Sequence, residues 1–218
     1  MSTRIVPKQP NIQINPASGK LGVLIRGMRA VTSTFIAGDE AGMQGLGALI
    51  GSLTQLATIR LGQRTEGRTQ KIKDFVPLTP LECLSFGTWD IYEDNAYEAA
   101  SRARVLDAGL LERVREPLAA IRPMKAVFDQ DYVRRINGPN VKSVPDKMQA
   151  AEALMADIQE FKVRNGCSRL VIIWCGSTEV FHKPAAAHQS LAAFEEGLRK
   201  NDPDIAPSQI YAYAGLRS

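Results

Sequence analysis

The chain has 218 residues, of which 44% are hydrophobic and 23% charged, and its formal net charge is +4. This composition is ordinary for a globular protein with one sizeable core, and so mild a charge does not require nucleic acid or an anionic membrane as partner. No apolar run reaches about 18 residues, so we expect no membrane span.

The N-terminal segment, residues 1–19, is rich in Pro, Asn and Ser and has no apolar core, which predicts an extended arm rather than a secretory signal. The three cysteines, Cys83, Cys167 and Cys175, are odd in number and lack metal-ligand spacing. We therefore expect reduced thiols, a cytoplasmic protein and no metal site.

The stretch 21–38, LGVLIRGMRAVTSTFIAG, begins with a predicted strand at 21–25 and continues into a predicted helix at 30–44. A strand, a glycine turn at Gly27 and a helix that opens on small residues are typical of a nucleotide-binding crossover, because the helix N-terminus attracts phosphate. The glycine pattern is incomplete, since Arg29 and Thr32 stand where a G-x-G-x-x-G motif needs glycine. An ordinary βα turn therefore stays open as an alternative. Asp39 is unusual on the apolar face of this helix, because a buried carboxylate is costly.

The long segment 45–80 combines many Gly, Thr and basic residues with mixed periodicity. Two interpretations stay open for its basic cluster: a solvated surface loop, or a lid that faces an anion. Contact with nucleic acid is a weaker third hypothesis, because the segment lacks interleaved aromatic residues. The cluster comprises Arg60, Arg64, Arg68, Lys71 and Lys73.

The rest of the chain, after residue 80, alternates between predicted strands and helices. We predict strands at 84–86, 125–128, 169–174 and 210–214, and helices at 95–104, 110–118, 147–165 and 187–199. The continuous apolar run RLVIIW at 169–174 predicts a central parallel strand buried on both faces, and the strand at 210–214 is expected to leave an apolar edge exposed. This alternation predicts an α/β fold: a doubly wound, mostly parallel Rossmann-like sheet with helices on both faces.

Polar, acidic and small residues follow the predicted strands at 27–34, 87–90, 129–131 and 175–179. In open α/β sheets, ligands bind outside the carboxyl ends of the strands. These residues together therefore indicate a binding crevice at that edge of the sheet.

Several longer motifs carry a specific resemblance. They are GSLTQLATIRLG at 51–62, KDFVPL at 73–78, FGTWDIYEDNAYEAA at 86–100, FDQDYV at 128–133 and LVIIWCGSTE at 170–179. Over residues 21–216 the sequence resembles the myo-inositol-1-phosphate synthases, in particular their bacterial branch. The resemblance implies an NAD-dependent isomerase that converts glucose 6-phosphate to inositol phosphate by oxidation, enolisation, aldol ring closure and reduction.

The resemblance also implies a set of cofactor-binding residues. The turn 27–33 would cradle the NAD pyrophosphate, Asp90 would lie near the adenosine ribose, and the remaining residues would line the crevice. The implied set is Gly27, Met28, Arg29, Ala30, Val31, Thr32, Ser33, Asp90, Asp131, Ser177 and Thr178. Capping of the next helix by Asp131 stays open as an alternative, as does a simple turn role for Ser177 and Thr178.

Two arginines depart from the family's turn: Arg29 stands where the bacterial branch carries glycine, and Arg26 where it carries a small residue. The Arg29 side chain would either block the pyrophosphate or bind it from the side. The second hypothesis for function is accordingly a non-catalytic Rossmann-like binding or assembly module that has lost NAD.

The family's catalytic lysines lie in a later region, and neither His182 nor His188 matches a catalytic motif. We therefore expect no catalytic residue in this chain. It would be a truncated NAD-binding portion at 20–218 that meets glucose 6-phosphate only where the catalytic domain is supplied. A homo-oligomer is expected from the full family.

Overall fold

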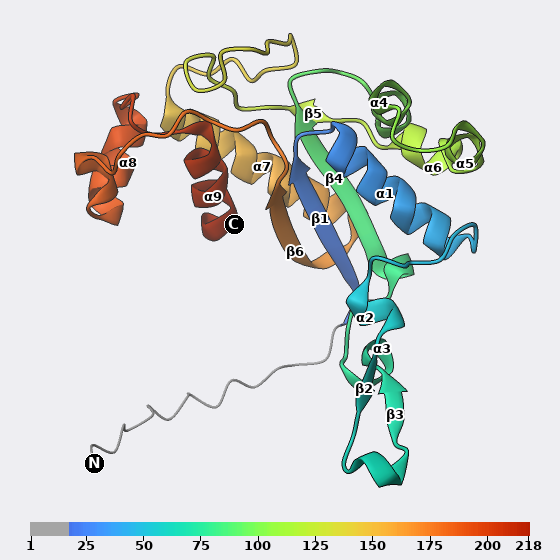
Figure 1. Cartoon of the computed structure of the whole chain (residues 1–218). Coiled ribbons are helices and arrows are strands. Elements are labelled where there is room, and N and C mark those ends of the chain that lie inside the picture. The colour runs from blue at the N-terminus through green and yellow to red at the C-terminus, as the bar shows by residue number, and fades with distance from the viewer. Residues whose placement is uncertain (1–17) are drawn as a thin grey trace, which may run out of the picture.

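The computed structural model describes residues 18–218 and contains a parallel four-stranded sheet with the strand order β5-β4-β1-β6 (Figure 1). The strands are β1 (Lys20–Arg26), β4 (Leu84–Asp90), β5 (Met124–Lys125) and β6 (Cys167–Trp174). The chain proceeds outward from β1 through β4 to β5 and then returns to the other side of β1. This reversal places the topological switch point between β1 and β6 and confirms the predicted Rossmann-like sheet.

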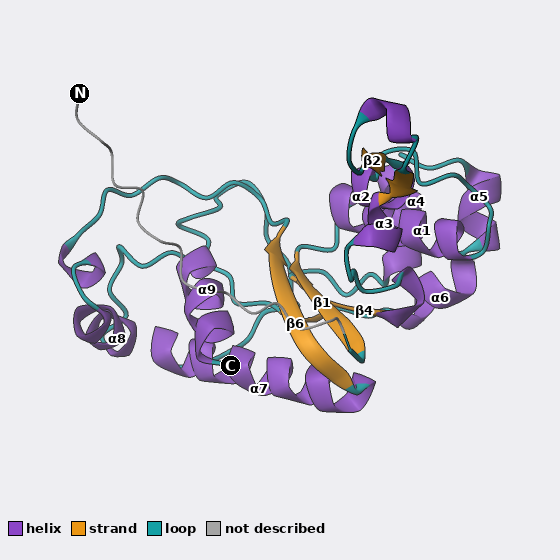
Figure 2. Cartoon of the chain, turned by 90° about the horizontal axis from the view of Figure 1, so that it is seen from below, coloured by secondary structure: helices purple, strands orange, loops and turns teal. Residues whose placement is uncertain are grey.

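Helices cover both faces of the sheet, as predicted (Figure 2). On one face lie α1 (Ala30–Met43), α4 (Ala96–Ala103), α5 (Ala108–Arg113) and α6 (Arg115–Ala120). On the other lie α7 (Lys147–Asn165) and α9 (Pro207–Arg217), with α8 (Leu191–Arg199) beside α7. Two hydrophobic clusters result, one on each side of the sheet.

Local capping explains several helix boundaries. Asn95 and Glu98 form a reciprocal capping box at the start of α4. Asp146 accepts a hydrogen bond of 2.7 Å from the Gln149 amide at the start of α7, and Gly166, with φ of +63°, ends that helix. These boundaries agree with the sequence signals.

The predicted strand at 210–214 is wrong, because these residues belong to α9. Pro207 occupies the first helical turn, and the buried residues Pro207, Ile210, Tyr211 and Ala214 recur at helical spacing. In the short segment IYAYA, large and small side chains alternate from Tyr211 onward, which resembles a strand until Pro207 is included in the window. The apolar edge expected from this strand is therefore absent as well.

The prediction that 169–174 forms a central strand buried on both faces is also wrong. Among the described residues, β6 is an edge strand that pairs only with β1. Val171 and Ile173 remain 41% and 36% exposed, while Leu170 and Ile172 pack toward α7 and α9. Helices thus cover only one face of β6.

Other predicted boundaries shift without changing the topology. The strand predicted at 84–86 extends to Asp90, and the strand predicted at 125–128 shrinks to Met124–Lys125 plus a single bridge between Ala126 and Val141. The helix predicted at 110–118 divides into α5 and α6 at Val114, and the helix predicted at 187–199 becomes a 3₁₀ turn followed by α8.

Residues 46–80 form a small extension between α1 and β4. It contains α2 (Leu53–Leu56), β2 (Thr58–Arg60), β3 (Thr69–Lys71) and α3 (Ile72–Phe75), with β2 and β3 paired as an antiparallel hairpin. Figure 1 shows this hairpin standing away from the sheet, at the end opposite the carboxyl ends of β1 and β4. The basic cluster is exposed there. This position favours a solvated surface over a lid on the crevice.

The predicted arm at 1–19 lies mostly outside the described residues, which begin at Ser18. Among the described helices, none combines the length and the hydropathy that a membrane crossing requires.

Asp39 is buried within α1, as the sequence suggested. Asp39 is only 6% exposed, and its Oδ2 atom has no hydrogen-bond partner among the described residues. Burial, and secondarily the neighbouring Glu40 carboxylate, raises the pKa of Asp39 from 3.8 to about 6. The charged carboxylate therefore destabilises the folded state.

We predict that burial of the Asp39 carboxyl group makes the stability of the protein depend on pH. A carboxyl group whose pKa is raised by folding favours the folded state at low pH, and this contribution is lost as the pH rises from about 4 to about 6. The free energy of unfolding should fall over this range by up to about 3 kcal/mol, and Asp39→Asn should remove most of the fall. Urea denaturation at several pH values measures it.

Exposed Glu152 of α7 provides the matched control: Glu152→Gln removes a carboxyl group that is not buried, so the fall in the free energy of unfolding should persist in this variant. Glu40, whose pKa is also raised by burial, should keep a smaller slope of the same sign in the Asp39 variant. Parallel profiles for Asp39→Asn and the unmodified protein would contradict the assignment.

Candidate functional site

The site is built around the turn between β1 and α1, at the carboxyl edge of the sheet. Two backbone hydrogen bonds hold this turn: the Gly27 amide donates to the Trp89 carbonyl (2.8 Å), and the Cys175 amide donates to the Arg26 carbonyl (2.8 Å). The turn is therefore fixed to the ends of β4 and β6 at the same time. It lies at the switch point where open α/β sheets bind ligands.

Gly27 is required by both conformation and space. Its φ of +101° lies in the region that side chains rarely adopt. A Cβ atom at this position would also lie 2.7 Å from the Cys175 carbonyl oxygen. Only glycine lets the turn approach the exit of β6 this closely.

Asp90 ends β4 and connects the turn to the following loop. It is 3% exposed. Its Oδ2 accepts a 2.5 Å hydrogen bond from the Met28 amide, and its Oδ1 accepts a 2.9 Å bond from the Tyr92 amide. Both carboxylate oxygens are therefore held by backbone N–H groups, which orients the residue that the sequence analysis assigned to the ribose.

The N-terminus of α1 faces the crevice without a side-chain cap. Arg29 is the N-cap residue and makes no capping hydrogen bond. The first N–H groups of a helix have no acceptor within the helix, and they carry the positive end of its dipole. The Thr32 hydroxyl donates to the Gly27 carbonyl, and buried Ser33 donates weakly to the Ala30 carbonyl at 3.4 Å. These two hydroxyls brace the turn, while the N–H groups remain available to a ligand.

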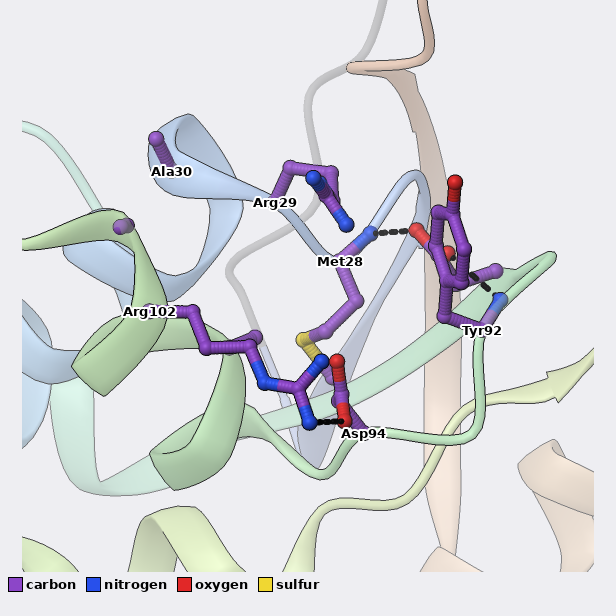
Figure 3. Close-up of a pocket in the computed structure, with 9 residues that line it drawn as sticks. Met28, Arg29, Ala30, Tyr92, Asp94 and Arg102 are labelled. Carbon is purple, nitrogen blue, oxygen red and sulfur yellow. Dashed lines mark hydrogen bonds and ion pairs between the residues drawn. The ribbon is translucent and has the colours of Figure 1, made fainter. Parts of the chain in front are cut away.

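A cavity of about 150 Å³ opens beside this turn, between α1, α4 and the exit of β4 (Figure 3). Because ligand pockets usually reach about 300–1,000 Å³, it suits one end of a larger ligand. Its lining residues are Met28, Arg29, Ala30, Asp90, Tyr92, Asp94, Ala99, Arg102 and Ala103.

Arg29 does not cross the front of the helix N-terminus. Its backbone is extended (φ −102°, ψ −159°), a conformation open to any residue, so glycine is not needed here for backbone geometry. Its guanidinium lies over the Tyr92 ring, 4.8 Å from the ring centroid. Across the cavity, Arg102 forms an ion pair of 3.0 Å with Asp94.

The side chain of Arg26, the other arginine of the turn, lies on the opposite face of the sheet from α1. Its guanidinium contacts the rings of Trp174 (5.4 Å) and Tyr211 (5.9 Å) and is almost completely buried. Its Nε has no hydrogen-bond partner among the described residues. Cation–π attraction offsets part of the cost of burying this charge, and the side chain stays away from the turn.

The remaining predicted residues lie farther from the cavity. Ser177 and Thr178 are exposed in the loop after β6, close in sequence to Cys175 at the turn. Asp131 is exposed in the loop after β5, where its amide donates to Asp129 Oδ1. The capping alternative for Asp131 is wrong, because the next helix, α7, is capped by Asp146.

Five residues of the cavity lining were not predicted from the sequence: Tyr92, Asp94, Ala99, Arg102 and Ala103. Tyr92 and Asp94 follow Asp90 closely in the motif FGTWDIYEDNAYEAA, so their position was a usable signal. Arg102 reaches the cavity only because α4 packs beside α1.

Comparison with known proteins identifies the family. A model for an NAD-binding domain, described as Myo-inositol-1-phosphate synthase, matches residues 21–218. The chain belongs to the myo-inositol-1-phosphate synthase family. It corresponds to the NAD-binding domain of an inositol-3-phosphate synthase, which confirms the predicted resemblance and its cofactor.

Relatives of this synthase family match along most of the chain. Inositol-3-phosphate synthase 1 of Bacteroides thetaiotaomicron is 45% identical over 206 residues, covering 94% of this chain and 47% of its own length. Inositol-3-phosphate synthase 1 of rice (Oryza sativa subsp. japonica) is 30% identical, with coverages of 89% and 41%. The chain thus spans about half the length of the curated relatives it matches.

Solved structures also superpose on most of the chain. The inositol-3-phosphate synthase of Caenorhabditis elegans superposes with a TM-score of 0.82 at 26% identity, covering 93% of this chain and 43% of that one. A myo-inositol-1-phosphate synthase-related protein of Thermotoga maritima matches with a TM-score of 0.55 at 19% identity over 90% and 44% of the two chains, and this likeness shows the fold alone.

We predict that Gly27→Ala damages both the fold and the cofactor site. The positive φ and the approach to Cys175 should lower the free energy of unfolding by about 2 kcal/mol or more. Chemical denaturation measures the loss, and titration with NAD should show no binding.

Gly38→Ala is the matched control, because Gly38 lies within α1 and a Cβ there would meet no atom within 4 Å. This substitution should stabilise the protein by about 0.5–1 kcal/mol. Equal stability of Gly27→Ala and the unmodified protein would contradict the role assigned to the turn.

Proposed function

We propose that the domain at 20–218 holds the NAD pyrophosphate at the N-terminus of α1 and serves an inositol-3-phosphate synthase. The observation that carries this proposal is the uncapped start of α1 directly behind Gly27, at the switch point of the sheet. Backbone N–H groups and the helix dipole favour an anion at this position. The residues from Met28 to Val31 would supply those groups.

The residues present fit this cofactor. The missing Cβ of Gly27 lets the chain turn beside Cys175, and the Arg29 side chain leans toward Tyr92 instead of filling the turn. Asp90 lies at the end of the strand next to β1, where a carboxylate suits the ribose hydroxyls, since each carboxylate oxygen can accept more than one hydrogen bond. These features support binding despite the incomplete glycine motif.

When bound, NAD would supply a reversible hydride acceptor. The described residues would bind and orient it: the α1 amides at the pyrophosphate, Asp90 at the ribose, and Ser177, Thr178 and Asp131 along the crevice. Enolisation and ring closure need a base and a cation for the oxyanion. We propose that these come from outside residues 18–218, so that this domain alone does not turn over glucose 6-phosphate.

The substrate, the oligomeric state and the compartment follow from the same proposal. Glucose 6-phosphate would be the substrate where the catalytic portion is present, and homo-oligomers would form as the resemblance implies. Three cysteines without disulfides support a reducing compartment such as the cytoplasm.

One observation favours the second hypothesis, an assembly module that has lost NAD: Arg26 and Arg29 occupy the turn at positions where the resemblance implies small residues. Replacement of Arg29 by glycine separates the hypotheses. NAD binding that appears only in Arg29→Gly would support the loss of cofactor in the natural chain.

We predict that isothermal titration with NAD gives a saturable binding heat for the unmodified protein. Asp90→Asn should weaken binding about tenfold, because a charge-assisted hydrogen bond contributes about 1.5–3 kcal/mol. Exposed Glu93, which is close in sequence but does not line the cavity, is the control as Glu93→Gln. Urea denaturation of each variant verifies that it is folded.

Failure of the unmodified protein to bind at millimolar NAD would overturn the proposed function. Turnover of glucose 6-phosphate by this chain alone would contradict the placement of the catalytic groups outside it. Asp131→Ala tests the last predicted contact separately, since weakened binding is expected only if Asp131 reaches the cofactor.

A further inference from the structure

Arg29 is a cation without an anionic partner at the rim of the cavity. Within residues 18–218 its guanidinium forms neither a hydrogen bond nor an ion pair with another side chain, and it contacts only the Tyr92 ring in a defined geometry. Stacking on an aromatic ring leaves the in-plane N–H donors of a guanidinium free to bind an oxyanion. Arg29 is therefore held in position with its donors unused.

Arg102 supplies a second guanidinium to the same cavity from α4. Its side chain is 72% exposed, whereas that of its partner Asp94 is only 18% exposed. Figure 3 shows Arg29 and Arg102 on opposite sides of the cavity, both extending toward its interior, with Tyr92 and Asp94 beside them. The small side chains of Ala99 and Ala103 complete the lining on α4.

The acidic groups of the cavity are already engaged. Asp94 pairs with Arg102, and both oxygens of Asp90 accept backbone N–H groups. Two guanidiniums thus face two carboxylates that have other partners, and the Arg29 charge remains uncompensated. In dinucleotide sites of this fold, an acid at the end of the second strand reads the ribose 2′-hydroxyl, whereas a nearby arginine accommodates a 2′-phosphate.

We propose that Arg29, assisted by Arg102, binds a phosphate on the 2′-oxygen of the adenosine ribose, so that the site accepts NADP as well as NAD. The inference rests on the proposed function and on its placement of the ribose at Asp90, which lines this cavity and which the resemblance assigns to the adenosine ribose. The Arg29 side chain would then determine cofactor specificity, and only the backbone N–H group of this residue would contribute to the pyrophosphate site.

Calorimetric titrations with NAD and NADP test the inference. NADP is expected to bind the unmodified protein at least as tightly as NAD. Arg29→Ala should weaken NADP about tenfold and change NAD less than threefold, because only the charge-assisted bond to the extra phosphate is lost. Arg102→Ala should produce a smaller selective loss, and exposed Arg122, which does not line the cavity, provides the control Arg122→Ala.

Three results would overturn the inference: NADP binding more than tenfold weaker than NAD, equal weakening of both dinucleotides by Arg29→Ala, or tighter NAD binding in that variant. The second result would assign Arg29 to the pyrophosphate, and the third would show that it obstructs the turn.

The adenosine fragments separate this inference from the proposed function. One outcome would be that neither dinucleotide binds, whereas adenosine 2′,5′-bisphosphate binds in an Arg29-dependent manner and more tightly than 5′-AMP. In that case the 2′-phosphate site stands and the proposed NAD function fails. If no fragment binds either, both are overturned.

Discussion

The close approach of the turn at Gly27 to the end of β6 is the constraint on which the site depends. At this point three strands meet within hydrogen-bond distance: Gly27 bonds to Trp89, Arg26 to Cys175, and Met28 to the Asp90 carboxylate. No side chain fits between the turn and the Cys175 carbonyl. Because these bonds fix the direction in which the chain leaves β1, they also aim the N-terminus of α1 at the crevice. In the proposed site, cofactor binding and packing of the sheet would therefore share one set of contacts.

The two arginines of the turn do not disturb its close approach to β6, because their side chains point away from the turn in different directions. Arg26 passes to the α9 face and contacts Trp174 and Tyr211, while Arg29 leans over Tyr92 beside the cavity. Aromatic rings hold both cations. Both arginines thus stand in the turn without closing the space in front of α1, and Arg29 places a guanidinium beside the cavity.

Local signals in the sequence predicted the elements that build the turn, as well as the helices with clear caps. Short stretches of sequence indicate the end of β1, the small residues at the start of α1 and the capping residue Asp146. Asp90 was also predicted, as part of a family motif. Its bond to Met28, which joins residues 62 positions apart, required the structure because only strand pairing brings them together.

The errors arose where tertiary surroundings outweigh local pattern. The apolar run of β6 suggested two buried faces, yet this strand lies at the edge with one face uncovered. The segment 210–214 alternates like a strand, but its burial against α7 and the sheet follows helical spacing. Arg102 joins Arg29 in the cavity lining through the packing of α4 on α1, a contact that no sequence window contains.

A ¹⁵N–¹H NMR titration with NAD tests the central claim most directly, because each backbone amide reports its own surroundings. If the turn held by Gly27 and Asp90 presents the N–H groups of α1 to the cofactor, saturable shifts should be largest for residues 27–33 and 90–92, and the amides of the hairpin 58–71 should not move. Saturable shifts that leave residues 27–33 unchanged, or no shifts at millimolar NAD, would contradict it.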